Sequence, residues 1–239
     1  MEEDRKEVNS ELPDITLNPP HEIAKISFGL GILLGCSLGF LFTLQFKSFN
    51  IYIISLATFH FLEYYVTAKY NPKKVHADSF LLKNGIEYIG AHTFASLECL
   101  MEYWICPNLK TGHSPLRKII FVVGLLMVVL GQLVRSISMR QAGRSFSHVV
   151  KVEKENDHKL VQDGLYSVFR HPSYFGFFWW ALGTQLILFN PISLILFCFV
   201  LWRFFNKRIK FEERHLIEFF GSSYIQYKKN VKVWIPFIM

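Results

Sequence analysis

The stretch RHPSYFG at residues 170–176 runs directly into the aromatic run FFWW at residues 177–180. Proline is favoured in the first turn of a helix, and it pushes the residue before it toward extended backbone. The pattern therefore predicts that a helix begins at Pro172 and that His171 lies at its amino-terminal mouth. Polar residues here adjoin an apolar segment, which is typical of a site at the edge of a membrane.

The composition of the 239-residue chain is that of a membrane protein. Hydrophobic residues make up 51% of the chain, 24 residues are Phe, and the mean hydropathy is +0.25. The apolar residues gather in long blocks. We therefore expect an all-α integral membrane protein with about six membrane segments.

Charge and cysteine content argue against several other classes. The formal net charge is +7, and Lys and Arg gather in short loops beside apolar blocks, which indicates a cytosolic membrane face rather than a nucleic-acid partner. The four cysteines have no CxxC spacing, so we expect neither a disulfide framework nor a metal site. Residues 1–22 are acidic and contain three prolines, which predicts a disordered cytosolic tail without the features of a secretory signal.

Four apolar blocks within residues 23–137 are each expected to form a membrane helix, since about 20 helical residues cross the hydrocarbon layer. They cover residues 23–46, 50–68, 85–106 and 116–137. An isolated charge in hydrocarbon costs at least ~2.5 kcal/mol, so ionisable residues inside these blocks are expected to face protein. Among them are His60 and Glu63 in the second block, and Glu87, His92, Glu98 and Glu102 in the third.

Residues 138–239 are expected to form the catalytic region. Residues 138–170 are polar, and they precede two apolar runs at 175–189 and 192–205 that are separated by the turn-forming pair Asn190-Pro191. Each run falls short of ~30 Å as a helix, which predicts a tight helical hairpin that need not cross the bilayer fully. Residues 206–239 are charged and amphipathic, and we expect them to lie on the membrane face.

Loop charges favour a cytosolic amino terminus. With that orientation, the 70–83 loop, the 138–170 segment and the basic C-terminal tail share the cytosolic side, as the positive-inside rule requires. The loop at 107–115, which contains Lys110, is the exception to this count.

Gly31, Gly35 and Gly39 recur every four residues in the first block and place a smooth stripe on one helix face. The stripe could form a homodimer seam, or it could pack against another helix of the same chain. The sequence leaves both readings open.

Two groups of residues could form a polar pocket at the membrane edge. The helix mouth at His171 favours a carboxylate or phosphate group, and Tyr174 with the aromatic residues after it could hold a ligand cation. Arg208 and Glu212 share one helix face at the polar end of the hairpin, next to Glu213. No Gly-rich nucleotide loop outside the apolar blocks, HExxH or GxSxG motif is present in the sequence.

The chain resembles the isoprenylcysteine carboxyl methyltransferases, most strongly over its last hundred residues. The shared text comprises AGRSFSH at 142–148, HKLV at 158–161, DGLY at 163–166, RHPSYFG at 170–176, GTQ at 183–185, Asn190-Pro191, WRFF at 202–205, Glu212-Glu213, FFG at 219–221, Tyr224, YKK at 227–229 and PFI at 236–238. Three positions depart from the family pattern: Lys151 stands for Gln, Ser145 for Asn and Lys232 for Pro.

The resemblance implies a cytosolic-face pocket for S-adenosylmethionine, formed by the 138–174 loop and the C-terminal amphipathic region. It implies cofactor contacts from His158, Lys159, Leu160, Val161, Tyr166, His171, Pro172, Ser173, Tyr174 and Glu212, and leaves a contact from Lys151 in doubt. Arg208 would bind the substrate carboxylate and be the catalytic residue.

The activity that the resemblance implies is methyl esterification of C-terminal farnesyl- or geranylgeranyl-cysteine, the last step of CaaX protein maturation, in the endoplasmic reticulum membrane. The implied partners are prenylated CaaX proteins and peptides, such as a mating pheromone and Ras-like GTPases, together with membrane lipid. A C-terminal carboxylate has a pKa of ~3.3–3.7, so it is already ionised at neutral pH and no histidine base is needed. The alternatives are a phospholipid amine methyltransferase and an NADPH-dependent sterol-type membrane reductase.

Overall fold

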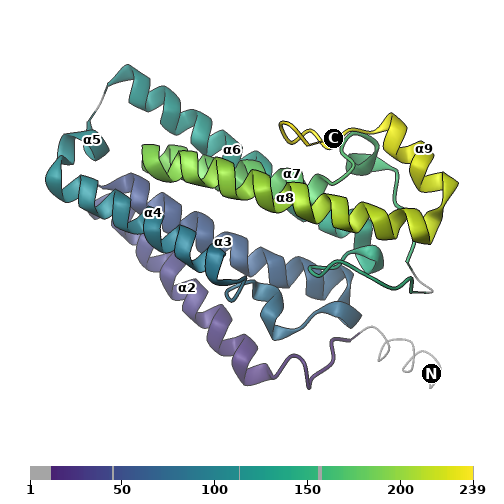
Figure 1. Ribbon diagram of the computed structural model, residues 1–239. Helices are drawn as coiled ribbons and strands as arrows, with labels where there is room; N and C mark the ends of the chain where they lie inside the picture. Colours follow the sequence, from purple (N-terminus) through teal and green to yellow (C-terminus); the bar gives the residue numbers. More distant parts are fainter. Residues whose placement is uncertain (1–11, 45, 113, 156–157, 239) are drawn as a thin grey trace.

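The computed structural model describes residues 12–44, 46–112, 114–155 and 158–238, and the described chain folds as a bundle of helices (Figure 1). Short 3₁₀ turns connect some of the helices, and the one β-bridge of the described residues joins Phe169 to Lys232. The helices are α2 (Pro20–Thr43), α3 (Lys47–Tyr70), α4 (Ile86–Ile105), α5 (Pro107–Thr111), α6 (Pro115–Ala142), α7 (Pro172–Leu188), α8 (Pro191–Phe220) and α9 (Ser222–Asn230).

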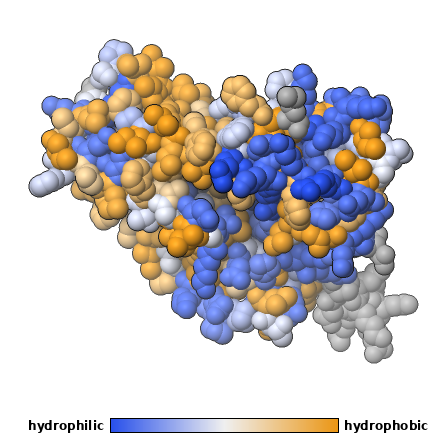
Figure 2. Space-filling view, viewed as in Figure 1, coloured by the Kyte–Doolittle hydropathy of each residue, from blue (hydrophilic) through white to orange (hydrophobic). Residues whose placement is uncertain are grey.

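Among the described residues, three segments are long and apolar enough to cross a membrane: α2, α3 and the helical stretch Pro115–Ser145 that contains α6. Hydrophobic residues cover much of the left-hand half of the molecule in Figure 2, and hydrophilic residues dominate the right-hand half. The all-helical membrane architecture is therefore confirmed, whereas the number of about six segments stays a prediction.

The ionisable residues of the second block face protein, as expected. Glu63 is fully buried, and His60 is buried with its Nδ1 atom 2.7 Å from the carbonyl oxygen of Phe80. In the third block Glu87 is exposed, so the expectation that it faces protein was wrong. Glu98 of the same block is buried, and its carboxylate accepts hydrogen bonds from the backbone N–H groups of Ile192 (2.8 Å) and Ser193 (2.7 Å). Glu98 thus caps the first turn of α8, whose N–H groups lack partners within the helix.

Lys110 explains the exception to the positive-inside count. Its ammonium group is buried at the turn between α7 and α8, where it donates to the carbonyl oxygens of Leu188 (3.0 Å) and Phe189 (2.8 Å) and to Oδ1 of Asn190 (2.9 Å). It also pairs with Glu102 at 2.5 Å. Because Lys110 caps a helix end and is paired, it is not a free loop charge.

The hairpin has a longer second arm than the sequence predicts. Helix α8 continues without a break from Pro191 to Phe220, about 45 Å at 1.5 Å per residue. The expectation of a separate surface segment beginning at residue 206 was therefore wrong. No Gly or Pro interrupts residues 192–220, and the helix ends only at Gly221, whose φ of 55° is left-handed. Arg208 and Glu212 consequently lie on the same helix as the hairpin's apolar arm.

Helices α6 and α7 pack at close range through facing glycines. A Cβ added to Gly131 would lie 2.6 Å from the carbonyl oxygen of Gly176, and one added to Gly124 would lie 2.9 Å from that of Gly183. Glycine permits this approach because it has no side chain. The contact fixes the start of α7, and with it His171 and Tyr174, against the membrane helices.

The amino-terminal region is ordered over more residues than expected. Residues 1–11 of the predicted tail lie outside the described residues, but Asn18 is buried and its amide donates to the carbonyl oxygen of Val75 at 2.8 Å. Helix α2 begins at Pro20, so the predicted boundary of the tail at residue 22 was wrong. On α2 the glycines at 31, 35 and 39 are exposed, and an added Cβ there would meet no described atom of this chain within 4 Å.

Candidate functional site

The RHPSY stretch forms the start of α7 as the sequence predicts. His171 precedes the helix with φ −129°, and Pro172 occupies its first turn. The ring of His171 stacks on the ring of Tyr174, with centroids 5.4 Å apart and an interplanar angle of 8°. A backbone bond from Arg170 N–H to the carbonyl oxygen of Lys232 (2.9 Å) holds the C-terminal segment against this turn.

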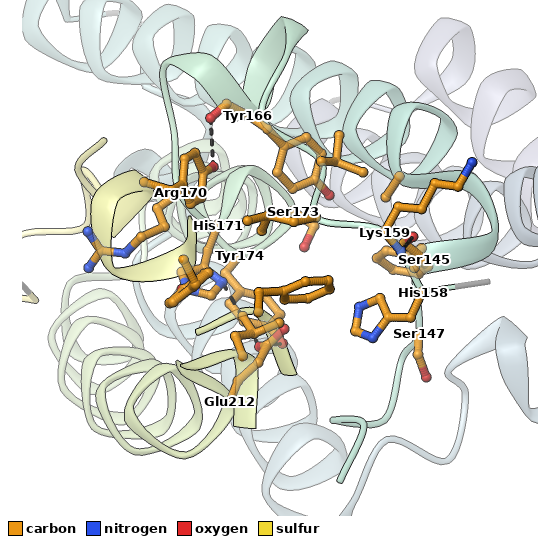
Figure 3. Close-up of a pocket in the computed structure, with 18 residues that line it drawn as sticks. Ser145, Ser147, His158, Lys159, Tyr166, Arg170, His171, Ser173, Tyr174 and Glu212 are labelled. Atoms are coloured by element: carbon orange, nitrogen blue, oxygen red, sulfur yellow. Dashed lines mark hydrogen bonds and ion pairs between the residues drawn. The ribbon is translucent and has the colours of Figure 1, made fainter. Parts of the chain in front are cut away.

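A cavity opens beside this turn, with about 650 Å³ of empty space that is partly open to solvent. Figure 3 shows His171, Tyr174 and Glu212 on one side of it, and His158 and Lys159 from the polar segment on the other. Its lining residues are Ala142, Ser145, Phe146, Ser147, His158, Lys159, Leu160, Val161, Tyr166, Arg170, His171, Ser173, Tyr174, Glu212, Leu216, Phe220, Tyr224 and Tyr227.

Glu213 anchors the RHPSY turn to α8. Its carboxylate accepts from Nε of Arg170 (2.5 Å) and Nε2 of His171 (3.2 Å) through one oxygen, and from Nζ of Lys228 (2.5 Å) through the other. Burial opposes ionisation of this carboxyl group, but the hydrogen bond and charge of His171, the hydrogen bond from Lys228 and the charge of Arg170 outweigh it and lower its pKa to about 2. Glu213 is therefore an ionised, fully paired group that orients its neighbours.

Tyr174 links the two groups that the sequence singled out. Its hydroxyl accepts a hydrogen bond from Nε of Arg208 at 2.8 Å and donates one to Oε2 of Glu212 at 2.5 Å. The guanidinium of Arg208 also lies over the Tyr174 ring, 5.3 Å from its centroid. His171 and the pair on α8 thus converge at one place, with Tyr174 between them.

Arg208 itself lines a second cavity, which shares Phe146, Ser147 and Tyr174 with the first. Its second hydrogen bond runs from Nη2 to the carbonyl oxygen of His148 at 2.5 Å. Most of the wall is apolar, and about 460 Å³ of empty space lies within it, partly open to solvent. The complete lining is Leu81, Asn84, Arg135, Phe146, Ser147, His148, Tyr174, Phe177, Phe204, Phe205 and Arg208.

Two adjoining cavities of different character therefore meet at Tyr174. The first carries a carboxylate, hydroxyl groups and backbone, and suits a polar molecule; the second combines apolar walls with Arg208, and suits an apolar chain that ends in an anionic group. A methyltransferase of lipid-modified carboxylates needs such a pair.

Comparison with known proteins agrees with this interpretation of the two cavities. The chain is 57% identical over 239 residues to protein-S-isoprenylcysteine O-methyltransferase of Saccharomyces cerevisiae, and the match covers 100% of both chains. The chain belongs to the isoprenylcysteine carboxyl methyltransferase family. The model of that family matches residues 122–218, which include the α7 residues of both cavities and all their α8 residues except Phe220. The human protein-S-isoprenylcysteine O-methyltransferase is 44% identical over 223 residues, covering 92% of this chain and 76% of the human one.

The fold of this isoprenylcysteine methyltransferase family member also matches a solved structure. That structure is described as the eukaryotic intramembrane Ras methyltransferase ICMT without a monobody, and it superposes with a TM-score of 0.86 at 36% identity. The match covers 91% of this chain and 77% of that one.

Nine of the ten cofactor contacts expected from the family resemblance line the first cavity among the described residues, and Pro172 does not. Pro172 instead starts α7. Lys151 is also absent from this lining; its Nζ atom binds Glu155 at 3.0 Å, near Lys74, which pairs with the same carboxylate. The departure from Gln at this position therefore lies outside the first cavity.

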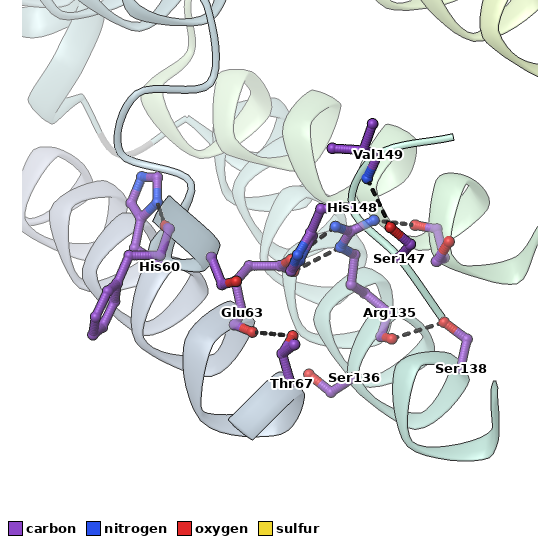
Figure 4. Close-up of polar contacts among 12 residues, drawn as sticks. His60, Glu63, Thr67, Arg135, Ser136, Ser138, Ser147, His148 and Val149 are labelled. Carbon is purple, nitrogen blue, oxygen red and sulfur yellow. Dashed lines mark hydrogen bonds and ion pairs between the residues drawn. The ribbon is translucent and has the colours of Figure 1, made fainter. Parts of the chain in front are cut away.

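Sequence reasoning missed Arg135, which lies on α6 and lines the second cavity. Its guanidinium donates two hydrogen bonds to the carboxylate of Glu63, at 2.6 and 2.7 Å, and Nε2 of His148 lies 2.9 Å from the same carboxylate (Figure 4). The fourth membrane block was expected to be apolar, although it contains this Arg. An ionisable residue inside a membrane segment is itself a signal of a functional site, and it could have been found.

Proposed function

We propose that this protein transfers a methyl group from S-adenosylmethionine to the C-terminal carboxylate of a prenylated cysteine, giving a methyl ester. The observation that carries the proposal is the hydroxyl of Tyr174 between Arg208 and Glu212, because it places a carboxylate-binding cation and a polar cavity side by side. The names of the relatives support this reaction for the chain, since they describe O-methylation of protein S-isoprenylcysteine.

The first cavity has the chemistry that S-adenosylmethionine requires. The cofactor carries hydroxyl, ammonium and carboxylate groups and a sulfonium, and the cavity is lined by the Glu212 carboxylate and by the aromatic residues Tyr166, Tyr174 and His171. Aromatic faces bind cations at about 0.5–2 kcal/mol each. When bound, the cofactor supplies an electrophilic methyl group.

The second cavity would hold the substrate. Arg208 has two of its N–H groups fixed by Tyr174 and His148, which sets the plane of the guanidinium toward a substrate carboxylate. Phe177, Phe204 and Phe205 provide apolar surface for a prenyl chain. We propose Arg208 as the substrate-binding and catalytic residue.

The reaction depends on the orientation and desolvation of the two reactants more than on proton transfer. The prenylcysteine carboxylate is ionised at neutral pH and is itself the nucleophile. The residues around Tyr174 would hold the two reactants in adjacent cavities, which raises the effective concentration of one at the other. His171 has a structural task here, since its ring binds Glu213 and stacks on Tyr174.

We also propose the membrane in which the enzyme lies and the substrates that it meets there. The membrane is that of the endoplasmic reticulum, with about six segments and with the cavities facing the cytosol, where S-adenosylmethionine and CaaX proteins are available. The substrates are prenylated CaaX proteins and peptides, including a mating pheromone and Ras-like GTPases.

A homodimer formed through Gly31, Gly35 and Gly39 belongs to this proposal. The stripe is exposed and would admit close approach of another helix, because an added Cβ meets no described atom of this chain within 4 Å. Crosslinking in membranes should yield a dimer that a Gly31→Leu/Gly35→Leu variant loses. An undiminished amount of crosslinked dimer in that variant would show that these glycines do not form the dimer interface.

The activity is tested by offering the purified protein different acceptors with labelled S-adenosylmethionine. We expect base-labile methyl ester on a farnesylcysteine analogue and no transfer to phosphatidylethanolamine. Binding of the cofactor without esterification of farnesyl- or geranylgeranyl-cysteine would refute the substrate. Tight binding of NADPH in place of S-adenosylmethionine would indicate a reductase instead.

A further inference from the structure

The carboxylate of Glu63 lies at the centre of a buried cluster that links three parts of the chain. Glu63 comes from α3, Arg135 from α6, and His148 from the segment that follows α6 (Figure 4). The side chain of Glu63 is fully buried, and those of the other two are less than a tenth exposed. The cluster lies beside the site rather than at the far end of the bundle, because Arg135 and His148 both line the second cavity.

Arg135 makes both polar and aromatic contacts. It donates two hydrogen bonds to Glu63, and its Nη1 atom donates to the carbonyl oxygen of Ser173 at 3.2 Å. Its guanidinium also lies near the neighbouring rings of Phe59 and Phe177, 6.0 and 5.7 Å from their centroids. Glu63 thereby neutralises the buried guanidinium of Arg135 in the second cavity. The hydrogen bond to Ser173 links the same guanidinium to the first turn of α7.

Both the ring and the backbone carbonyl group of His148 make polar contacts. Its ring binds the Glu63 carboxylate at 2.9 Å, and its carbonyl oxygen accepts the 2.5 Å hydrogen bond from Arg208. Residues 146–150 form neither helix nor strand, so backbone hydrogen bonds of regular structure do not fix this carbonyl. The ring contact with Glu63 holds His148 against α3.

We infer that Glu63 is a positioning residue for the substrate carboxylate: through His148 it holds the carbonyl group that orients Arg208. The inference rests on the proposed role of Arg208. Glu63 touches neither reactant, so its removal should weaken the binding of prenylcysteine through Arg208 and leave the binding of S-adenosylmethionine unchanged.

The test compares Glu63→Gln with Glu98→Gln, which removes the charge of another buried carboxylate at the opposite end of the bundle. For Glu63→Gln we expect the KM for a farnesylcysteine analogue to rise about tenfold or more, with the KM for S-adenosylmethionine within twofold of the parent. Glu98→Gln should change neither KM. A role confined to stability would lower the amount of active enzyme and leave both KM values as they are.

Two further variants keep the test decisive if Glu63→Gln folds poorly. His148→Phe removes the ring contact but retains the backbone carbonyl, and it should raise the same KM in the same direction. In an Arg208→Lys background, Glu63→Gln or His148→Phe should change the farnesylcysteine KM less than twofold, because the residue through which they act is already altered.

An unchanged farnesylcysteine KM in both Glu63→Gln and His148→Phe would overturn the inference, and so would equal increases in both KM values. Neither result would affect the proposed function, which fails only if the parent protein does not esterify prenylcysteine.

Discussion

Gly131 of α6 and Gly176 of α7 face each other so closely that a Cβ on either would lie 2.6 Å from the carbonyl oxygen of the other. Both obstacles are backbone atoms, which cannot move aside like a flexible side chain. Since Gly176 lies two residues after Tyr174, this contact also sets the position of the site.

Gly131→Ala is therefore expected to destabilise the protein by about 3 kcal/mol through overpacking. The methyl-transfer activity per folded molecule should fall as well, because α7 must shift. Gly90→Ala is the matched control: an added Cβ there meets no described atom within 4 Å, and Ala favours a helix over Gly. Thermal unfolding in detergent micelles measures the difference, and equal unfolding midpoints for the two variants would contradict the close contact.

Tyr174→Phe retains the ring but removes the hydroxyl that joins Arg208 to Glu212. Hydrogen bonds to charged groups contribute about 1.5–3 kcal/mol, so kcat/KM for a farnesylcysteine analogue should fall roughly 10- to 100-fold. Tyr64→Phe loses a hydroxyl bonded to Asn18, and because neither residue lines either cavity, it should leave kcat/KM unchanged. Steady-state kinetics of the two variants separates a local effect from a general one, and parent-like kinetics of Tyr174→Phe would show that the link is dispensable.

Glu213 should make the unfolding temperature of the protein depend on pH. The pKa of its native carboxyl group is about 2, below the ~4.3 of an unfolded chain, so ionisation stabilises the fold fully above pH ~4.3. That contribution is lost as the pH falls toward 2. We expect the unfolding temperature of the parent protein to drop more steeply between pH 6 and pH 3 than that of Glu213→Gln. Parallel curves would mean that Glu213 is not an ionised partner of Arg170 and Lys228.

Lys110→Met leaves three acceptors at the turn between α7 and α8 and the Glu102 carboxylate without their cation. Removal of one partner of a buried ion pair typically costs ~3 kcal/mol, and thermal unfolding should show that loss. Lys118→Met, at an exposed position of α6, serves as the control and should be nearly neutral. If both variants unfold at the parent temperature, Lys110 does not cap α7.

Local sequence rules predicted the helical architecture, and the family resemblance named nine of the residues that line the first cavity. The proline after His171 and the position of Arg208 four residues before Glu212 determine local geometry, and the fold brought these residues together as expected. His60 and Glu63 were also correctly assigned to the protein interior, since the cost of a charge in lipid leaves no other choice.

The remaining features depend on contacts between distant segments. The partnership of Lys110 with the end of α7, and that of Glu63 with His148, join residues about 80 positions apart, which no local pattern reveals. The seven-residue spacing of Gly124 and Gly131 matches that of Gly176 and Gly183, and it gains meaning only when two antiparallel helices align them. The uninterrupted length of α8 was visible in the absence of Gly and Pro, but the change from apolar to charged residues suggested a break.

The most direct test of this account measures esterification of a farnesylcysteine analogue by the parent protein and by Arg208→Ala, together with S-adenosylmethionine affinity. Loss of charge-assisted hydrogen bonds to the carboxylate should lower kcat/KM about 100-fold or more, while the Kd for S-adenosylmethionine stays within twofold. Arg203→Ala, an exposed Arg on the same helix, should behave as the parent. Full esterification by Arg208→Ala, or an equal loss of cofactor affinity, would contradict the claim that Arg208 binds the substrate carboxylate.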